Sequence, residues 1–196
     1  MTRKPVAAAL LILSVWSAVL GLDALGLAAG PAFADQKDSR LDSLFDQLKT
    51  SATPREAAIL ELSIWQIWSE TEDDDAALLF RRGLEAMAAG DTEAALRRFT
   101  EVTKRAPDFA EGWNKRATVL FMMGDYDASV ADVEQTLALE PRHFGALSGL
   151  GLINMALGRD AAAVKAFEAA LAIHPHLPGA QKFVKELKAK LAGKPT

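Results

Sequence analysis

Apolar residues recur along this chain at the spacing of α-helices. After residue 158, Val164, Phe167 and Leu171 fall at positions i, i+3 and i+7, which places them on one face of a helix. Before residue 158, Leu147 and Leu150 supply a second apolar stripe, with small Gly151 beside them. Either stripe alone would leave apolar surface in water, so the pattern predicts two helices packed against each other.

Glycine and proline punctuate this pattern at a fixed interval of 34 residues. The repeated positions are Gly90, Gly124 and Gly158, and 17 residues after each of them Pro107, Pro141 and Pro175. Glycine ends a helix readily because it accepts left-handed backbone, and proline stops the next helix because it lacks an N–H. Asp91 and Asp125 directly follow two of the glycines and are suited to cap the next helix, whereas Asp160 stands one residue later. The chain is therefore predicted to contain three helical hairpins, at residues 76–109, 110–143 and 144–177.

Equivalent positions of the three units share a residue pattern. The first unit has Gly83, Ala95, Phe99 and Pro107, with Leu79 where tryptophan is usual. The second unit has Trp113 and Pro141, but Arg116, Ala117 and Ser129 where Leu, Gly and Ala are usual. The third unit has Leu150, Gly151, Ala163, Phe167, Ala170 and Pro175. This pattern resembles that of the tetratricopeptide repeat (TPR) family, W-x2-L-G-x2-Y followed by A-x3-F and P. The resemblance covers a little over half of the chain and implies an all-α solenoid. It implies little about function, because TPR arrays bind many unrelated partners.

Residues 35–75 are predicted to hold a polar leader, a helical hairpin and an acidic linker. A short amphipathic helix is indicated by four apolar residues at i, i+3, i+4 and i+7: Leu41, Leu44, Phe45 and Leu48. Thr53 is suited to cap a second helix that has Pro54 in its first turn. The apolar residues of this second helix lie on more than one side, which predicts burial: Ala57, Ala58, Leu60, Leu62, Ile64, Trp65, Ile67 and Trp68. We expect the hairpin, residues 41–70, to cover the open end of the first repeat.

Two charged segments flank the repeats. The acidic run before the first repeat lacks the alternating ligands and the glycine of a calcium loop, so its aspartates are predicted to cap the next helix: Glu70, Glu72, Asp73, Asp74 and Asp75. Residues 178–196 are predicted to form a capping helix, with Phe183, Val184, Leu187 and Leu191 on one face. Its remaining faces carry lysines, for which contact with an acidic partner is the alternative role: Lys182, Lys185, Lys188 and Lys190.

Residues 1–34 have the pattern of an export signal. Arg3 and Lys4 precede an apolar stretch from Val6 to Leu22, and an Ala-Phe-Ala site ends at Ala34. The pattern predicts cleavage there and a periplasmic protein without further membrane contact. The alternative is an uncleaved anchor in the inner membrane through residues 6–22, a stretch close to the roughly 20 residues that span a bilayer.

Composition excludes several classes of function. The chain has no cysteine, which excludes disulfides, thiolate catalysis and cysteine metal sites. Its net charge of −4 gives no basic field for nucleic acid. His143, His174 and His176 lie in loops around the prolines, and only two of their nitrogens converge in sequence, so they are interpreted as loop histidines in polar turns. Without a nucleophile motif or a phosphate loop, we expect neither enzymatic activity, nor a cofactor, nor a metal.

The resemblance implies a binding groove lined by the first helix of each hairpin. The family positions that line it correspond to Phe80, Leu84 and Met87; Asn114, Thr118 and Phe121; and Ser148, Leu152 and Met155. Six of these nine are apolar, which suits an apolar peptide or an amphipathic helix. Some members of the family instead grip a terminal carboxylate with lysine, arginine and asparagine, but Phe80 and Leu84 occupy the clamp positions of the first unit. The alternative to an open groove is one covered by residues 41–70, with Trp65 or Trp68 filling it.

Together these features predict a protein-interaction scaffold of the bacterial cell envelope, built from three TPR repeats with helical caps. The alternative function is a structural subunit docked permanently in an envelope or secretion complex. Trp113, at the family's tryptophan position, is expected in the core. The sequence does not indicate the partner or the oligomeric state.

Overall fold

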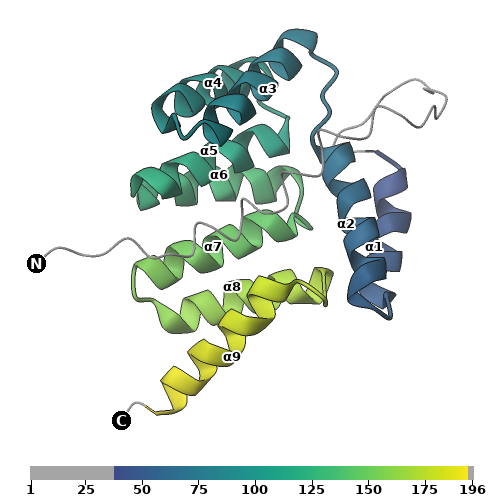
Figure 1. Cartoon of the computed structure of the whole chain (residues 1–196), viewed down its shortest axis with the longest axis vertical. Helices are drawn as coiled ribbons and strands as arrows, with labels where there is room; N and C mark the ends of the chain where they lie inside the picture. Colours follow the sequence, from purple (N-terminus) through teal and green to yellow (C-terminus); the bar gives the residue numbers. More distant parts are fainter. Residues whose placement is uncertain (1–37, 194–196) are drawn as a thin grey trace, which may run out of the picture. The chain divides into compact units, whose positions relative to one another are not determined.

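The computed structural model describes residues 38–193, which form nine α-helices joined by short loops (Figure 1). The helices are α1 (Arg40–Thr50), α2 (Pro54–Trp68), α3 (Asp74–Ala88), α4 (Thr92–Arg105), α5 (Ala110–Met123), α6 (Tyr126–Leu139), α7 (Phe144–Ala156), α8 (Asp160–Ile173) and α9 (Pro178–Ala192). From α3 to α9 each helix packs on the next in chain order, so three hairpins and a last helix form one stack, here called the array. This confirms the all-α repeat fold.

The glycine and proline positions end the helices as the sequence predicts. Gly90, Gly124 and Gly158 all have left-handed backbone, with φ of 77°, 82° and 71°. Each second helix ends two residues before its proline. Asp91 and Asp125 accept hydrogen bonds from backbone N–H groups of α4 and α6, which confirms them as N-caps.

The acidic run before α3 also caps a helix. The Asp73 carboxylate accepts the Ala76 N–H at 2.9 Å, and Arg105 Nε donates to the same oxygen at 2.7 Å. Both bonds hold the pKa of Asp73 below its usual value, the arginine bond being the larger cause. Asp73 therefore fixes the start of α3 and ties it to the end of α4.

Glycine and phenylalanine form the contact inside the first and third hairpins. A Cβ atom on Gly83 would lie 2.6 Å from the ring of Phe99, and one on Gly151 would lie 2.6 Å from the ring of Phe167. The second hairpin has Ala117 at the glycine position, and the smaller Val133 stands where the others have phenylalanine. In each hairpin, therefore, a small residue on the first helix leaves room for a larger apolar side chain on the second helix.

The predicted hairpin of residues 41–70 is present as α1 and α2. Thr53 caps α2 by accepting the Glu56 N–H at 3.2 Å, while the Glu56 carboxylate accepts the Ala52 N–H at 3.0 Å. The inner faces of both helices are buried: Leu41, Phe45 and Leu48 from α1, and Ala57, Leu60, Ile64, Ile67 and Trp68 from α2. On the outer side of α2, Ile59 and Leu62 are exposed, so this helix is less buried than its composition predicts.

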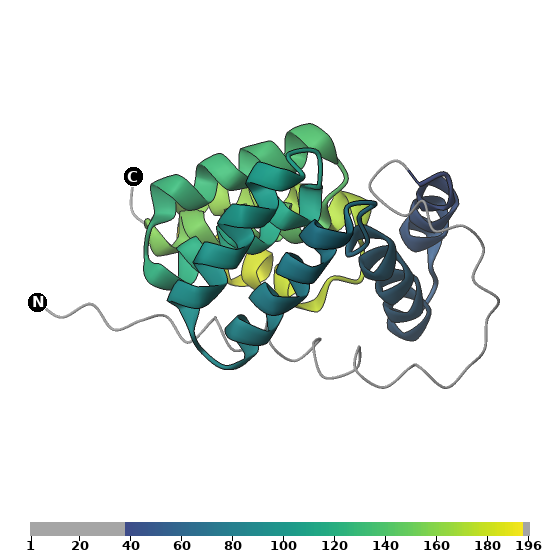
Figure 2. The ribbon, with the colours of Figure 1, turned by 90° about the horizontal axis from the view of Figure 1, so that it is seen from above.

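The predicted position of this hairpin, over the open end of the first repeat, is wrong. Its core is shared with Phe144 of α7 and Ala170 of α8, which belong to the third repeat. Figure 1 shows α2 crossing the ends of the array helices on the side of the proline loops, and in Figure 2 the same hairpin, in the darkest colours, lies beside those ends. One contact that permits this position is between residues far apart in the chain: Gly145 leaves room for Trp65, whose ring would come within 2.6 Å of a Cβ atom there.

The last helix packs on α8. Phe183 stacks on Phe167 with ring centroids 5.2 Å apart. Lys190 contacts Asp160 at 2.8 Å, and Lys188 contacts Glu168 at 2.6 Å, so two of the four lysines pair with carboxylates of α8. The predicted export signal lies outside residues 38–193, and within that range no helix is long and apolar enough to cross a membrane.

Candidate functional site

The nine positions assigned to the binding groove lie on α3, α5 and α7, and are here called the first-helix face. Three of them are buried: Phe80, Asn114 and Leu152. The other six are partly accessible: Leu84, Met87, Thr118, Phe121, Ser148 and Met155. The structure therefore places all nine on the first helices, and six of them retain contact with solvent.

The buried members of this face have partners inside the array. The ring of Phe80 lies 5.0 Å from that of Phe109 and 5.7 Å from that of Phe99, so this side chain belongs to the core of the first hairpin. The Asn114 amide donates to Glu111 Oε2 at 2.8 Å. Phe80 and Asn114 therefore shape the face from beneath rather than meet a ligand.

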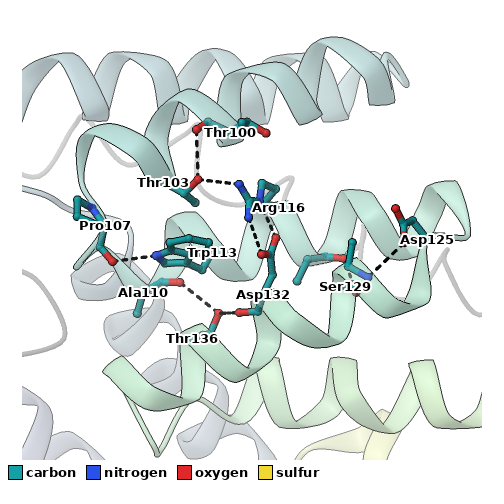
Figure 3. A network of polar contacts seen from close by, with 12 residues as sticks. Thr100, Thr103, Pro107, Ala110, Trp113, Arg116, Asp125, Ser129, Asp132 and Thr136 are labelled. Atoms are coloured by element: carbon teal, nitrogen blue, oxygen red, sulfur yellow. Dashed lines mark hydrogen bonds and ion pairs between the residues drawn. The ribbon is translucent and has the colours of Figure 1, made fainter.

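The second repeat departs from the family pattern through a polar network (Figure 3). Arg116 Nε and Nη2 donate to the two oxygens of Asp132 at 2.7 and 2.6 Å, and Arg116 Nη1 donates to Thr103 Oγ1 at 2.9 Å. The Ser129 hydroxyl, at the position of the usual alanine, donates to the Ala117 carbonyl at 2.7 Å. Polar bonds between α5 and α6 thus add to the apolar contact of this hairpin, to which Ala117 and Val133 belong.

Trp113 is not the core residue that its position predicts. It is only partly buried, its indole N–H donates to the Pro107 carbonyl at 2.9 Å, and the guanidinium of Arg116 lies 4.7 Å from its ring centre. Because Arg116 is drawn to Asp132 beneath it, Trp113 covers this ion pair instead of entering an apolar core.

A second cluster lies where the hairpin meets the array, here called the hairpin junction. The ring of Trp68 stacks on His143 with centroids 4.1 Å apart, and Trp65 meets His143 and Phe144 edge-on at 5.5 Å. Lys115 Nζ lies 5.0 Å from the centre of the Trp65 ring. The two tryptophans thus cover the beginning of α7 and part of α5.

The hydrogen bonds of His143 fix its protonation. Its Nδ1 accepts the backbone N–H of Ala146 at 3.1 Å, which caps α7, so this nitrogen carries no proton. The proton therefore lies on Nε2, which donates to Glu111 Oε2 at 2.9 Å. His143 is a neutral imidazole that joins the start of α7 to α5.

Glu111 is an ionised carboxylate buried under the hairpin. Burial by itself would raise its pKa, but the Lys115 ammonium, 2.7 Å from Oε1, and the bond from His143 outweigh burial and hold the pKa below the usual carboxyl value. A buried carboxylate of this kind stays charged because its partners are fixed around it.

Polar contacts also cross the junction at its edges. Arg142 donates to Asp42 of α1 at 2.6 Å. The Nε2 atom of His174 lies 3.1 Å from Glu61 Oε2, and His176 Nε2 donates to the Ser51 carbonyl at 2.8 Å. All three histidines of the chain therefore lie at this junction, and the interpretation as residues of polar turns is wrong for His143 and His174, which are 0% and 1% exposed.

The junction was not predicted, although the sequence carries one signal for it. Glu61, Trp65 and Trp68 stand at i, i+4 and i+7, on one face of α2. The hairpin also has an open cleft of about 410 Å³ between its two helices, lined by Arg40, Ser43, Leu44, Ser63, Gln66, Ile67 and Glu70. Among the described residues, no group of three or more His, Asp or Glu is arranged to hold a metal ion.

Comparison with known proteins identifies the repeats. Residues 80–127 and 114–178 match the sequence model of the tetratricopeptide repeat. A TPR repeat-containing protein of Rhizobium etli is 41% identical over 157 residues, which make up 80% of this chain and 77% of that protein. The small glutamine-rich tetratricopeptide repeat-containing protein 2 of Saccharomyces cerevisiae is 31% identical over 60% of this chain, and the match spans 34% of the yeast protein.

Among solved structures, the first TPR of Spaghetti (RPAP3), bound to the HSP90 peptide SRMEEVD, has a TM-score of 0.58 at 22% identity and covers 60% of this chain and 94% of its own. At that identity the similarity concerns the fold alone. The residues that match the repeat model, 80–127 and 114–178, include both glycine–phenylalanine contacts and the three left-handed glycines. The chain belongs to the tetratricopeptide repeat family.

Proposed function

We propose that this chain is a non-enzymatic protein-binding scaffold that seats a peptide or helix on its first-helix face. One observation carries the proposal: four apolar side chains of this face, Leu84, Met87, Phe121 and Met155, are partly accessible. The α1–α2 hairpin contacts the array through apolar, ring and polar contacts, and the array residues in these contacts are not members of the first-helix face. This favours an open face over a face covered by residues 41–70. Partly exposed methionine also adapts to ligands of varied shape.

The ligand is proposed to be an internal apolar segment rather than a chain terminus. The TPR of Spaghetti was solved with an HSP90 peptide that ends in EEVD. In this chain the clamp positions of the first repeat hold Phe80, buried against Phe99 and Phe109, and Leu84. Neither side chain can donate a hydrogen bond to a carboxylate, so an amphipathic helix is the better ligand.

Photo-cross-linking from defined positions of the full chain tests this function. A photoreactive residue at Met155 is expected to capture a partner in the native host, and Leu84→Glu is expected to abolish the product. Met123 is the matched control, because it is a methionine at the end of α5 that is 45% exposed and outside the first-helix face. Capture from Met123 but not from Met155 would contradict the proposal.

The same control position tests the alternative function, a subunit docked permanently in a larger assembly. Met122, Met123 and Leu157 are exposed near the glycine turns, and such apolar residues are typical of protein contacts. Capture from Met123 would favour this alternative.

Export to the bacterial periplasm is part of the proposal, on the strength of the pattern in residues 1–34. Mass spectrometry of the protein purified from its host should find Asp35 as the first residue. A chain that keeps residues 6–22 and fractionates with the inner membrane would support the anchored alternative.

A further inference from the structure

The hairpin junction divides by chemistry into two unlike halves. On the array side, the polar groups that meet the hairpin are basic or imidazole groups: Lys115, Arg142, His143, His174 and His176. On the hairpin side they are two carboxylates, three aromatic faces and one carbonyl: Asp42, Glu61, Phe45, Trp65, Trp68 and Ser51. Complementary halves of this kind are typical of an interface between two bodies.

The array half is held in place by the array itself. Glu140, which is buried, accepts hydrogen bonds from Arg142 Nε at 3.0 Å and Nη2 at 3.2 Å. Glu111 holds Lys115 at 2.7 Å and His143 at 2.9 Å. Three of the five groups that face the hairpin are thus oriented by array carboxylates, which lowers the entropy lost when a ligand binds them.

The hairpin half supplies a specific helical ligand. Glu61 bonds to His174 at 3.1 Å and also accepts the Trp65 indole N–H at 3.2 Å. Trp65 lies against Gly145, where an added Cβ atom would meet its ring at 2.6 Å, and Trp68 covers His143. Trp68 is buried and Trp65 is partly buried. Tryptophan is enriched among the few residues that supply most of the binding energy at protein interfaces.

The hairpin is joined to the array as a tethered ligand would be. The segment between α2 and α3, Ser69 to Asp73, is not helical. The polar contacts of the hairpin go to residues far along the chain: Asp42 and Arg142 are 100 residues apart, and Glu61 and His174 are 113 apart. A five-residue segment spans at most about 18 Å, so its length decides whether the hairpin can reach its own array.

Two buried polar atoms at the junction are unsatisfied. The indole nitrogen of Trp68 and Nδ1 of His174 are buried, and neither has a hydrogen-bond partner among the described residues. Each such atom reduces the free energy gained when the hairpin docks, which favours a contact that can open.

From these observations we propose that the array edge formed by Lys115, Arg142, His143, Phe144, Gly145 and His174 is a docking site that also accepts the α1–α2 hairpin of a second copy of this chain. The hairpin is the segment whose fit to the edge the structure displays, so a second copy brings the same carboxylates and tryptophans. At low concentration the tether favours the chain's own hairpin; at high concentration, or with a shortened tether, two copies exchange hairpins and form a dimer. This site is separate from the first-helix face and does not depend on its ligand.

Shortening the tether of the full chain tests the proposal. Deletion of Thr71 and Glu72 leaves three residues between α2 and α3 and should convert the monomer to a particle of twice the mass by light scattering. Insertion of four Gly-Ser residues at the same place should restore the monomer. A deletion variant that stays folded and monomeric would overturn the proposal.

Cross-linking then identifies which contact joins the two chains, since the natural chain has no cysteine. Chains with Asp42→Cys are mixed with chains with Arg142→Cys, in the deletion background, and treated with a short bis-maleimide. The expected product is a heterodimer. Ile59→Cys is the matched control, because Ile59 lies on the outer side of α2, is 60% exposed and should give no product with Arg142→Cys. A dimer that cross-links equally well from Ile59→Cys is not hairpin exchange and refutes the proposal.

The natural tether gives a second measurement in case the deletion prevents folding. The same two cysteine variants, with the tether intact, are incubated together at high concentration just below the thermal transition. Exchange predicts a cross-linked heterodimer whose amount increases with time and with protein concentration. An excess of the natural chain, which has no cysteine, should lower that amount at least tenfold. No heterodimer under these conditions would also overturn the proposal.

Discussion

The indole ring of Trp68 lies parallel to the imidazole ring of His143, with 4.1 Å between centroids and 8° between planes. Trp68 ends α2, and His143 caps α7, so one ring contact joins the N-terminal hairpin to the third repeat. Because His143 also bonds to Glu111 of α5, the second and third repeats share this contact with the hairpin.

Replacement of Trp68 by alanine is expected to lower the free energy of unfolding by about 3–5 kcal/mol, because the ring is buried against four aromatic partners. Urea denaturation followed by circular dichroism measures this change. Ile59→Ala, on the exposed side of the same helix, is the control and should change stability by less than about 0.5 kcal/mol. If both variants lost the same free energy of unfolding, the ring contacts of Trp68 at the junction would contribute no more to stability than an exposed side chain.

Glu111 predicts how stability depends on acid. Its folded-state pKa is lowered, so its contribution is fully present above the ordinary carboxyl value of 4.5 and is lost as the pH falls through the lower folded value. Glu111→Gln should destabilise the chain by about 3 kcal/mol at pH 7, because Lys115 and His143 lose their buried partner. Thermal melting between pH 3 and 7 should show a shallower acid dependence for the variant than for the natural chain. Parallel curves would contradict this assignment.

The repeat fold could be predicted from the sequence because its signals are local. Gly90 and Pro107, with their equivalents, act on the backbone of their own turn, and Asp73 and Thr53 cap the helices that follow them directly. Such residues produce the same structure whatever lies around them, so a period of 34 residues sufficed to predict three hairpins.

The position of the hairpin could not be predicted in this way. It depends on Gly145 leaving room for Trp65, two residues 80 positions apart, and no periodicity in the chain links them. The burial of Phe80 likewise depends on Phe109, an aromatic residue just before α5. Trp113 lies outside the core because Arg116, three residues later, bonds to Asp132 on the next helix and packs on the Trp113 ring. In each case a side chain from a different element decided the outcome.

The ion pair of Arg116 and Asp132 is expected to be costly to break and easy to replace. Asp132 is buried, so Asp132→Asn should cost about 3 kcal/mol by leaving the guanidinium without its charge partner. The double variant Arg116→Leu with Asp132→Leu puts an apolar pair in place of the buried ion pair and should recover most of that loss. Chemical denaturation of the natural chain, Arg116→Leu, Asp132→Leu and the double variant gives the coupling energy.

An exposed pair of the same charges is the control for this measurement. Arg97 and Glu93 are 3.9 Å apart and well exposed, and Glu93→Gln should change stability by less than about 0.5 kcal/mol. If the double variant at Arg116 and Asp132 were no more stable than Asp132→Asn, apolar side chains could not take the place of this ion pair, and the prediction would be wrong.

Comparison of the hairpins predicts a compensating pair of substitutions in the third repeat. Gly151→Ala adds a methyl group that would meet the Phe167 ring at 2.6 Å, and crowding of this kind should cost about 1–3 kcal/mol. The second repeat accepts Ala117 with Val133 at the phenylalanine position, so Phe167→Val should relieve the clash when added to Gly151→Ala. Phe167→Val alone leaves a cavity and should destabilise the chain, which makes the two substitutions non-additive by at least about 1 kcal/mol. Thermal and urea unfolding of the two single variants and the double variant measure this coupling. Simple additivity would show that the glycine is required for another reason than the approach of the ring.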